Sequence, residues 1–422
     1  MDKFIVTGGV PLRGAVSAGG SKNACLPIIT AALLAPGEYR ITGVPNLRDV
    51  RTIAHLMRVT GAKVDLEDGA MRIDTTHADF PEAPYELVKT MRASIYVLGP
   101  LLARFGRARV SLPGGCAWGP RPVDLHIKGM EALGATVTLD GGYINATAER
   151  LRGAHIYLDV ASVGATGNIM MAAVLADGVT TIENAAEEPE IVNLGEFLSA
   201  MGARISGLGT RHVTIEGVSE LSPPPPFAVI PDRIEAGTFL AAALLTGGDV
   251  TVRDCNPDHL QKVLVKLQEA GARLSVDSDS VRLRADGPIR PTDVTTTVYP
   301  GFPTDMQAQW IALMALADGG SVITDTIYTD RFTHVPELRR LGANVERKGN
   351  TAFVRGVDHL TAAPVMSTDL RASASLVMAA LAARGTSEIL RVYHIDRGYE
   401  RIEAKLQELG ADIERVNDGT MH

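Results

Sequence analysis

The chain has 422 residues, enough for two or three domains of the usual size. Its 41 basic residues against 49 acidic ones give a formal net charge of −8, which argues against a nucleic-acid-binding protein with an overall basic surface. No apolar run reaches the ~18–20 residues of a membrane span, and the three cysteines fit neither a disulfide framework nor a zinc site, so we expect a cytoplasmic globular protein that binds no membrane and no metal.

The first elements along the chain are a strand segment, FIVTGGVPLRGAVSAGG (4–20), and a helix that begins within AGGSKNACLP (18–27). Lys22 and Asn23 stand directly after a Gly-Gly turn at the start of this helix. Backbone amides at a helix start, together with one ammonium group, predict an anion site. The alternative is a plain turn between lobes with a solvated lysine.

An internal repeat organises the rest of the chain. A Gly-Ala dipeptide recurs six times, at intervals of about 70 residues. In each copy the residues before it have the apolar spacing of a helix, and those after it alternate between apolar and polar. The glycine predicts a left-handed C-cap and the alternation predicts a strand. A second helix rich in small residues lies upstream in each copy, which predicts six βαβαββ units. The six glycines are Gly61, Gly134, Gly202, Gly271, Gly342 and Gly410.

The small-residue helices have no charged face, so we expect an α/β fold with helices inside and sheets outside. Four consecutive prolines in LSPPPPFAVIPDR (221–233) follow the third repeat and predict a stiff linker between two lobes. The predicted lobes are residues 21–229 and residues 1–20 plus 230–422, with three repeats each. The N-terminal strand is expected to complete the sixth repeat.

The stretch SLPGGCAWGPRPVDLHIKG (111–129) is too rich in glycine and proline for a helix or strand, which is typical of a functional loop. Within it, Cys116 lies five residues before Arg121. A thiol near cationic groups has a lowered pKa and can act as an acid, base or nucleophile. Cys25 and Cys255 lie in or beside apolar runs and are expected to be buried.

Four arginines hold matching places in the repeats, namely Arg92, Arg331, Arg371 and Arg397. Guanidinium groups bind phosphates and carboxylates through two hydrogen bonds, so this set predicts an anion-binding site. The alternative for any one of them is a surface salt bridge with a neighbouring aspartate. Asp305 also stands just before a small-residue helix, where it can be an N-cap or a general base, and the spacing favours the cap.

The motifs together resemble the enolpyruvyl transferases, and within them the branch that acts on UDP-N-acetylglucosamine. The resemblance extends from Met1 to about Val416, and these enzymes are two-lobed inverse α/β barrels of six βαβαββ units. The motifs that carry it are SKNACLP (21–27), PGGC with RPVDLH (113–126), SVGAT (162–166), GFPTDMQAQ (301–309), TDLRASASLV (368–377) and HIDRGYERIE (394–403).

The resemblance implies a role for each matching residue. Cys116 is the expected proton donor, and Lys22 and Asn23 are expected to bind phosphoenolpyruvate. Arg121 and Arg397 are expected to line its phosphate, and Arg331 and Arg371 to organise the anionic part of the site. Contacts to the UDP-sugar are implied for Arg92, Arg121, Pro122, Val123, Asp124, Leu125, Ser162, Val163, Gly164, Asp305 and Ile327. One position departs from some members, because Val160 stands where they have a lysine.

The implied reaction is transfer of the enolpyruvyl group to the sugar 3′-hydroxyl with loss of phosphate, a step of peptidoglycan and cell-wall synthesis, without a cofactor. In this reaction Cys116 protonates C3 of phosphoenolpyruvate and Asp305 takes the hydroxyl proton, while Lys22 and Arg397 stabilise the phosphate. The resemblance also implies that the epoxide antibiotic fosfomycin alkylates Cys116. The alternatives are a shikimate-pathway enolpyruvyl transferase and a catalytically silent paralogue that binds UDP-sugars.

Overall fold

The computed structural model describes residues 2–89, 91–112 and 123–417. The chain forms two compact units. The central unit is Gly20–Ile230, and the terminal unit, which carries both chain termini, is Met1–Gly19 with Pro231–His422. The boundaries expected from the sequence, after residues 20 and 229, each differ from these by one residue.

The third repeat shows the architecture of every repeat. Its elements follow in the order β10 (His155–Tyr157), α6 (Val163–Ala173), β11 (Val179–Glu183), α7 (Pro189–Ala200), β12 (Arg204–Ser206) and β13 (His212–Glu216). They form a sheet of order β10-β11-β13-β12, in which β10 and β11 are parallel and the other pairs are antiparallel. The described part of the chain contains six four-stranded sheets of this pattern, which confirms the βαβαββ prediction.

The other two repeats of the central unit have the same order. The first contains α1 (Lys22–Ala31), η1 (Ala32–Leu34), β3 (Glu38–Thr42), α2 (Arg48–Val59), β4 (Lys63–Glu67) and β5 (Ala70–Asp74). The second contains β6 (Glu82–Ala83), α3 (Tyr85–Val88), η2 (Arg92–Val97), α4 (Leu98–Phe105), β7 (Arg107–Ser111), α5 (Asp124–Ala132), β8 (Thr136–Asp140) and β9 (Tyr143–Thr147).

The terminal unit contains the remaining three repeats. The fourth comprises α8 (Arg233–Leu245), β15 (Asp249–Arg253), η3 (Pro257–Leu260), α9 (Gln261–Glu269), β16 (Ala272–Val276) and β17 (Ser280–Ala285). The fifth comprises β18 (Val294–Thr296), η4 (Thr304–Met306), α10 (Gln307–Met314), β19 (Gly320–Asp325), α11 (Val335–Arg340), β20 (Asn344–Lys348) and β21 (Thr351–Arg355). The sixth comprises β22 (Pro364–Met366), α12 (Leu370–Ala382), β23 (Thr386–Leu390), η5 (Val392–Arg397), α13 (Ile402–Glu408) and β24 (Asp412–Asn417).

Three strands pair with strands that are distant from them in the sequence. The N-terminal segment was expected to form one strand of the sixth repeat, and β1 (Asp2–Thr7) does pair with β23 and β24. The same segment contains a second strand, β2 (Arg13–Ser17), which pairs with β15 of the fourth repeat. The first repeat in turn obtains its outer strand, β14 (Phe227–Ala228), from the residues that follow the third.

The proline run is not itself the linker that was predicted. Residues 223–226 belong to the central unit, and the chain crosses to the terminal unit only after Ile230. Pro223 packs so closely on Gly37 that a Cβ atom at Gly37 would lie 2.5 Å from the Pro223 Cγ. The prolines therefore cover part of the central unit and lead into β14.

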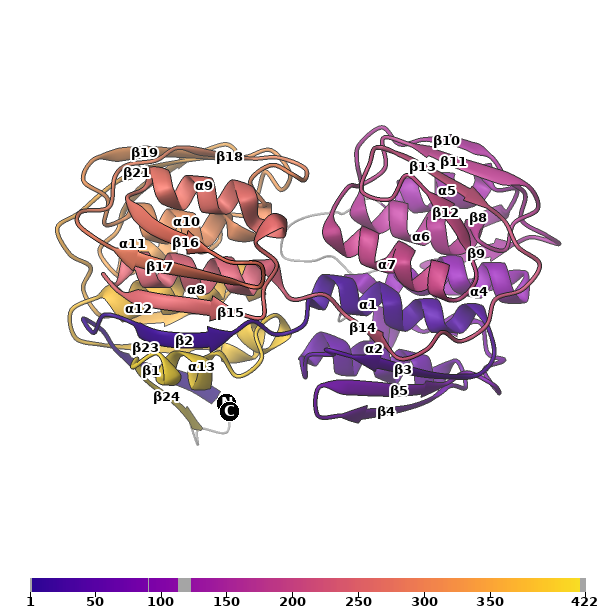
Figure 1. Cartoon of the computed structure of the whole chain (residues 1–422), viewed down its shortest axis with the longest axis horizontal. Helices are drawn as coiled ribbons and strands as arrows, with labels where there is room; N and C mark the ends of the chain where they lie inside the picture. The colour runs from indigo at the N-terminus through magenta and orange to yellow at the C-terminus, as the bar shows by residue number, and fades with distance from the viewer. Residues whose placement is uncertain (1, 90, 113–122, 418–422) are drawn as a thin grey trace. The chain divides into compact units, whose positions relative to one another are not determined.

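Burial separates two kinds of helix. In the terminal unit every residue of α8 after Arg233 and every residue of α10 is buried, as are Arg371–Leu381 of α12. Helices such as α2 and α9 bury only one face. Figure 1 shows α8 and α10 enclosed by the strands of the terminal unit, so the predicted placement of helices inside and sheets outside is confirmed. Of the helices described, none is both long and apolar enough to span a membrane.

Each unit also buries one histidine. His126 on α5 is 3% exposed and its Nδ1 accepts a hydrogen bond of 3.0 Å from the Nδ2 of Asn168. His334, which precedes α11, is fully buried and stacks on the Phe332 ring. Burial lowers the pKa of both histidines to about 3, and a nearby arginine adds to the effect in each case.

We expect Gly134, one of the six repeat glycines, to be needed for its backbone conformation alone. All six have positive φ values between +85° and +108°, and at Gly134 an added Cβ would meet no atom within 4 Å. Gly134→Ala should therefore lower the free energy of unfolding by about 1 kcal/mol through backbone strain, and Gly134→Asn by less. Denaturant unfolding of both variants checks this, and an alanine variant as stable as the original chain would contradict it.

The two buried histidines should make stability depend on pH. Between pH 6.5 and about 3 a histidine in the unfolded chain binds a proton that the folded chain does not, so the free energy of unfolding falls as the pH is lowered through this window. One such group contributes a slope of up to about 1.4 kcal/mol per pH unit. We expect His334→Asn to show a shallower loss of stability from pH 6.5 to 4.5 than the original chain.

The control for this measurement is His359→Asn, which removes an exposed histidine from the same unit. That variant should keep the steeper pH dependence of the original chain. Equal slopes for both variants would show that the burial of His334 does not govern acid stability.

Candidate active site

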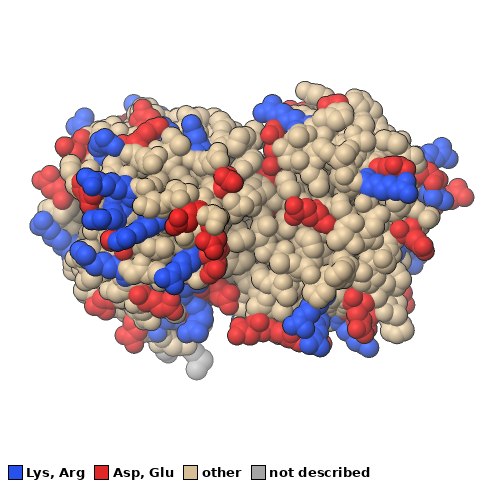
Figure 2. All heavy atoms as spheres, viewed as in Figure 1, with Lys and Arg blue, Asp and Glu red and all other residues tan. Residues whose placement is uncertain are grey.

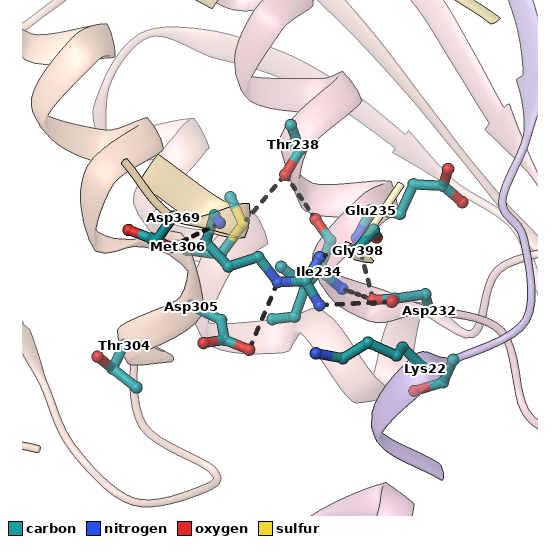
Figure 3. A network of polar contacts seen from close by, with 12 residues as sticks. Lys22, Asp232, Ile234, Glu235, Thr238, Thr304, Asp305, Met306, Asp369 and Gly398 are labelled. Carbon is teal, nitrogen blue, oxygen red and sulfur yellow. Dashed lines mark hydrogen bonds and ion pairs between the residues drawn. The ribbon is translucent and has the colours of Figure 1, made fainter. Parts of the chain in front are cut away.

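In the terminal unit the three inner helices run side by side with their N-termini together. Gln309 on α10 donates a hydrogen bond of 3.1 Å to the hydroxyl of Thr238 on α8, which aligns these two helices. The side chain of Asp232 caps the N-terminus of α8, and that of Asp369 caps the N-terminus of α12. Asp305 lies in η4, directly before α10. The fold therefore brings three aspartates from three repeats to one end of the unit, as Figure 3 shows.

Asp305 is not the helix cap that its spacing favours. Neither η4 nor α10 has a side-chain capping hydrogen bond. Instead one carboxylate oxygen of Asp305 accepts a hydrogen bond of 2.6 Å from Arg331, and the other lies 3.6 Å from the Nε of Arg371. The side chain is 23% exposed, so part of the carboxylate remains open to a reactant.

Arg331 and Arg371 are buried, which contradicts the surface salt-bridge alternative for both. Their side chains are 7% and 1% exposed. Besides Asp305, Arg331 has Asp369 at 3.9 Å, and Arg371 has Asp232 at 3.5 Å. Burial opposes the charged guanidinium, but the surrounding carboxylates outweigh it and raise the pKa of both arginines above the ordinary value. Both arginines therefore stay charged within the terminal-unit cluster, which comprises Asp232, Asp305, Asp369, Arg331 and Arg371.

The buried side chain of Tyr399 packs against this cluster. Tyr399 is 1% exposed, its hydroxyl lies 2.9 Å from that of Thr238, and the guanidinium of Arg371 lies 5.1 Å from its ring centre. Tyr399, Asp232 and Asp369 were not among the predicted site residues. The signal that could have found the two aspartates is their position one or two residues before an arginine at a predicted helix start.

Hydrogen bonds of neighbouring residues connect the other predicted residues of the terminal unit to this cluster. Arg397 is the last residue of η5, and the carbonyl of the next residue, Gly398, accepts a hydrogen bond of 3.4 Å from Arg371. Ile327 follows β19 and is 36% exposed, with its backbone amide bonded to Asp325 at 2.9 Å. Asp325 also accepts a hydrogen bond of 2.7 Å from Thr304, the neighbour of Asp305.

The central unit has a matching arrangement at the start of α1. Ser21 caps this helix, and Lys22 in its first turn is 8% exposed and pairs with Asp49 at 3.5 Å. The alternative of a solvated lysine is therefore wrong. Asn23 follows Lys22 on the same turn. Further along, the Thr30 hydroxyl contacts the sulfur of Met171 on α6 at 3.8 Å, so α1 and α6 touch near their C-terminal ends.

The predicted UDP-sugar residues of the central unit gather around Asn168 and His126. Ser162 caps α6, followed by Val163 and Gly164, and a Cβ at Gly164 would lie 3.1 Å from the His126 ring. Asn168 bonds to the carbonyl of Ile95 and the amide of Gly99, which holds α6 against η2 and α4. Arg92 begins η2, and Val123, Asp124 and Leu125 begin α5.

Backbone amides at the start of α6 can therefore bind an anion, helped by nearby Arg92. Val160, at the position where some members of the family carry lysine, is 59% exposed. Its neighbour Asp159 pairs with Lys128 at 3.6 Å.

Three predicted residues, Cys116, Arg121 and Pro122, lie outside the residues that the structure describes. The other two cysteines are free and buried, as expected, and burial raises the pKa of both thiols. Among the described residues, no group of three or more histidine, cysteine, aspartate or glutamate side chains is arranged to hold a metal ion.

Comparisons with known proteins give a consistent family. A profile of EPSP synthase (3-phosphoshikimate 1-carboxyvinyltransferase) matches residues 6–406. The UDP-N-acetylglucosamine 1-carboxyvinyltransferase of Chlorobium chlorochromatii is 57% identical over 98% of this chain and 99% of its own. That of Geotalea uraniireducens is 55% identical over 99% of this chain and all of its own.

Two solved structures share the fold. The enolpyruvyl transferase NikO from Streptomyces tendae matches with a TM-score of 0.88 and 27% identity, over 98% of each chain. EPSP synthase from Acinetobacter baumannii matches with a TM-score of 0.77 and 19% identity, over 99% of this chain and 100% of its own. With relatives this similar over nearly its whole length, the chain belongs to the EPSP synthase family, and within it to the UDP-N-acetylglucosamine 1-carboxyvinyltransferases.

Proposed function

We propose that this protein transfers the enolpyruvyl group of phosphoenolpyruvate to the 3′-hydroxyl of UDP-N-acetylglucosamine and releases phosphate, the first committed step of peptidoglycan synthesis. The observation that carries the proposal is the Asp305 carboxylate, held by two buried arginines at the meeting point of helix N-termini and still partly exposed. The names of the full-length relatives support the choice of acceptor.

The reaction needs a base that accepts the proton of the sugar hydroxyl and an acid that protonates phosphoenolpyruvate. Asp305 is the proposed base, because its two guanidinium neighbours favour the ionised carboxylate that can accept the proton of the sugar hydroxyl. The hydroxyl oxygen then bonds to C2 of phosphoenolpyruvate while C3 receives a proton, and Cys116 is the proposed donor. The resulting tetrahedral intermediate loses a proton from C3 and expels phosphate. This elimination restores the double bond between C2 and C3 and gives the enol ether product.

The anionic groups of both substrates require cations. Lys22 and Asn23 of the central unit, with Arg121 and Arg397, are proposed to bind phosphoenolpyruvate. Burial of Lys22 beside Asp49 fixes its ammonium group as a preformed contact, which costs little reorganisation when the phosphate binds. The start of α6, from Ser162 to Gly164, is proposed to bind the nucleotide diphosphate through its amides, together with Arg92.

The remaining predicted residues are proposed to shape the nucleotide-sugar site. Pro122, Val123, Asp124 and Leu125 precede or begin α5, and Ile327 offers a partly exposed apolar side chain. The cytoplasm is the proposed location, because two of the cysteines are free buried thiols of the kind found in a reducing compartment.

The acceptor test separates this function from its alternatives. The purified protein should release phosphate from phosphoenolpyruvate when UDP-N-acetylglucosamine is present, and not when shikimate 3-phosphate replaces it. Phosphate release with shikimate 3-phosphate would instead assign the activity for which the family profile is named. Tight binding of the nucleotide sugar without any phosphate release would indicate a catalytically silent protein.

Cys116→Ser should nearly abolish turnover while nucleotide-sugar binding persists, since a hydroxyl is a far weaker acid than a thiol and cannot deliver the proton to C3. Cys116→Asp should retain activity with its maximum at lower pH, because a carboxylic acid can also donate. Cys255→Ser, which changes a buried cysteine, is the matched control and should be as active as the original chain. Full activity of Cys116→Ser at neutral pH would remove Cys116 from the acid role.

A further inference from the structure

The segment that carries Arg397 is held in a backbone conformation that it would not adopt alone. It lies between Arg391, with a φ of +58°, and Arg401, with a φ of +44°. Residues other than glycine rarely occupy this left-handed region, because the Cβ atom approaches the following carbonyl. Interactions with the surrounding structure must therefore fix the segment.

One guanidinium group provides much of that fixation. Arg415 on β24 binds Asp396 with two hydrogen bonds of 2.6 and 3.1 Å, and Asp396 directly precedes Arg397. The same guanidinium binds Glu403 on α13 with hydrogen bonds of 2.9 and 3.3 Å. Arg415 therefore links η5 and α13, on either side of the strained turn, to the last sheet of the terminal unit.

Arg415 occupies an unusual place for a charged residue. The buried face of β24 includes Ile413, and strand alternation places residue 415 on the same face. Its partner in register is the fully buried Phe4 on β1, and the guanidinium lies 4.9 Å from that ring. The side chain is 24% exposed and lies between the Phe4 ring and three carboxylates, those of Asp396, Glu403 and Asp2, the last at 3.5 Å.

The other side of Arg397 is fixed as well. The carbonyl of Gly398 accepts a hydrogen bond from Arg371, and the hydroxyl of Tyr399 lies within hydrogen-bonding distance of Thr238. Arg397 thus stands between Asp396, which Arg415 holds, and Gly398, which the terminal-unit cluster holds.

We propose that Arg415 is a positioning residue, which orients Arg397 toward the phosphate of phosphoenolpyruvate by fixing Asp396. The inference rests on the proposed function, in which Arg397 binds that phosphate. A bidentate guanidinium contact sets both the distance and the angle of Asp396, whereas a single ammonium contact would set only the distance.

The test compares Arg415→Lys with the unsubstituted full-length protein. Lysine keeps the charge and the stem but loses the paired hydrogen bonds. We expect kcat/KM for phosphoenolpyruvate to fall by about tenfold or more, because a misplaced phosphate ligand lowers the rate steeply. The KM for UDP-N-acetylglucosamine and the thermal unfolding midpoint should stay close to their original values. Asp396→Asn keeps the bond between Arg415 and Glu403 and should give the same kinetic result.

Arg282→Lys is the matched control. Arg282 on β17 also binds one carboxylate, that of Asp249, with two hydrogen bonds of 2.8 Å each. Figure 2 shows basic side chains with acidic ones among them over this part of the terminal unit, and Arg273 and Arg284 form further ion pairs there. The Arg282–Asp249 pair lies in the sheet of the fourth repeat and contacts no proposed site residue, so this variant should keep its kinetics.

A double variant shows whether Arg415 acts through Arg397. If it does, Arg415→Lys should cause no further loss of kcat/KM when Arg397→Lys is already present. Additive losses, or single-variant kinetics equal to those of Arg282→Lys, would overturn the inference while the proposed function stands. An unsubstituted protein that releases no phosphate from the two substrates would overturn the proposed function, and this inference with it.

Discussion

The packing of α8, α10 and α12 side by side in the terminal unit, with their N-termini together, is the constraint on which the site depends. The N-termini of such helices meet at one end, where their partial positive charges and unbonded amides are concentrated. In the terminal unit three aspartates neutralise this end, and two buried arginines then balance the aspartates. In the central unit the caps of α1 and α6 are neutral serines, and Lys22 and Arg92 add positive charge. The terminal unit therefore presents carboxylates bound to buried arginines, and the central unit presents serine caps beside a buried lysine–aspartate pair.

The sixfold repeat explains why residues distant in sequence serve one reaction. Every repeat places the start of its inner helix at the same end of its unit, so that Ser21, Ser162, Asp232 and Asp369 are equivalent capping positions. Mutation at this one position of the repeat changes the chemistry without changing the framework. The glycine that ends the second helix of each repeat has the same left-handed backbone conformation in all six copies, and this conformation is its structural role.

The repeat, the buried helices and the two units could be predicted because they depend on local patterns, such as the six Gly-Ala dipeptides and the alternating strands. The pairing of β14 could not, since β14 has only two residues and its partner β3 lies far earlier in the chain. Asp305 was expected to cap a helix because sequence spacing cannot show that Arg331, later in the same repeat, and Arg371 of the next repeat approach it. Arg415 escaped prediction for a similar reason: its position in an alternating strand favours an apolar residue, and only the fold reveals the three carboxylates that bind it.

The strand exchange also sets the order in which the chain can fold as the ribosome produces it. Synthesis makes β1 and β2 first, but their partners β23, β24 and β15 belong to the terminal unit and appear only after the whole central unit. The central unit becomes complete once β14 has emerged, so it can fold while the two leading strands still wait unpaired. Phe4 and Val6, fully buried in the finished protein, lack their partner strands throughout that interval. Nascent chains of this architecture therefore present apolar residues of β1 that find their partners only when the terminal unit is synthesised.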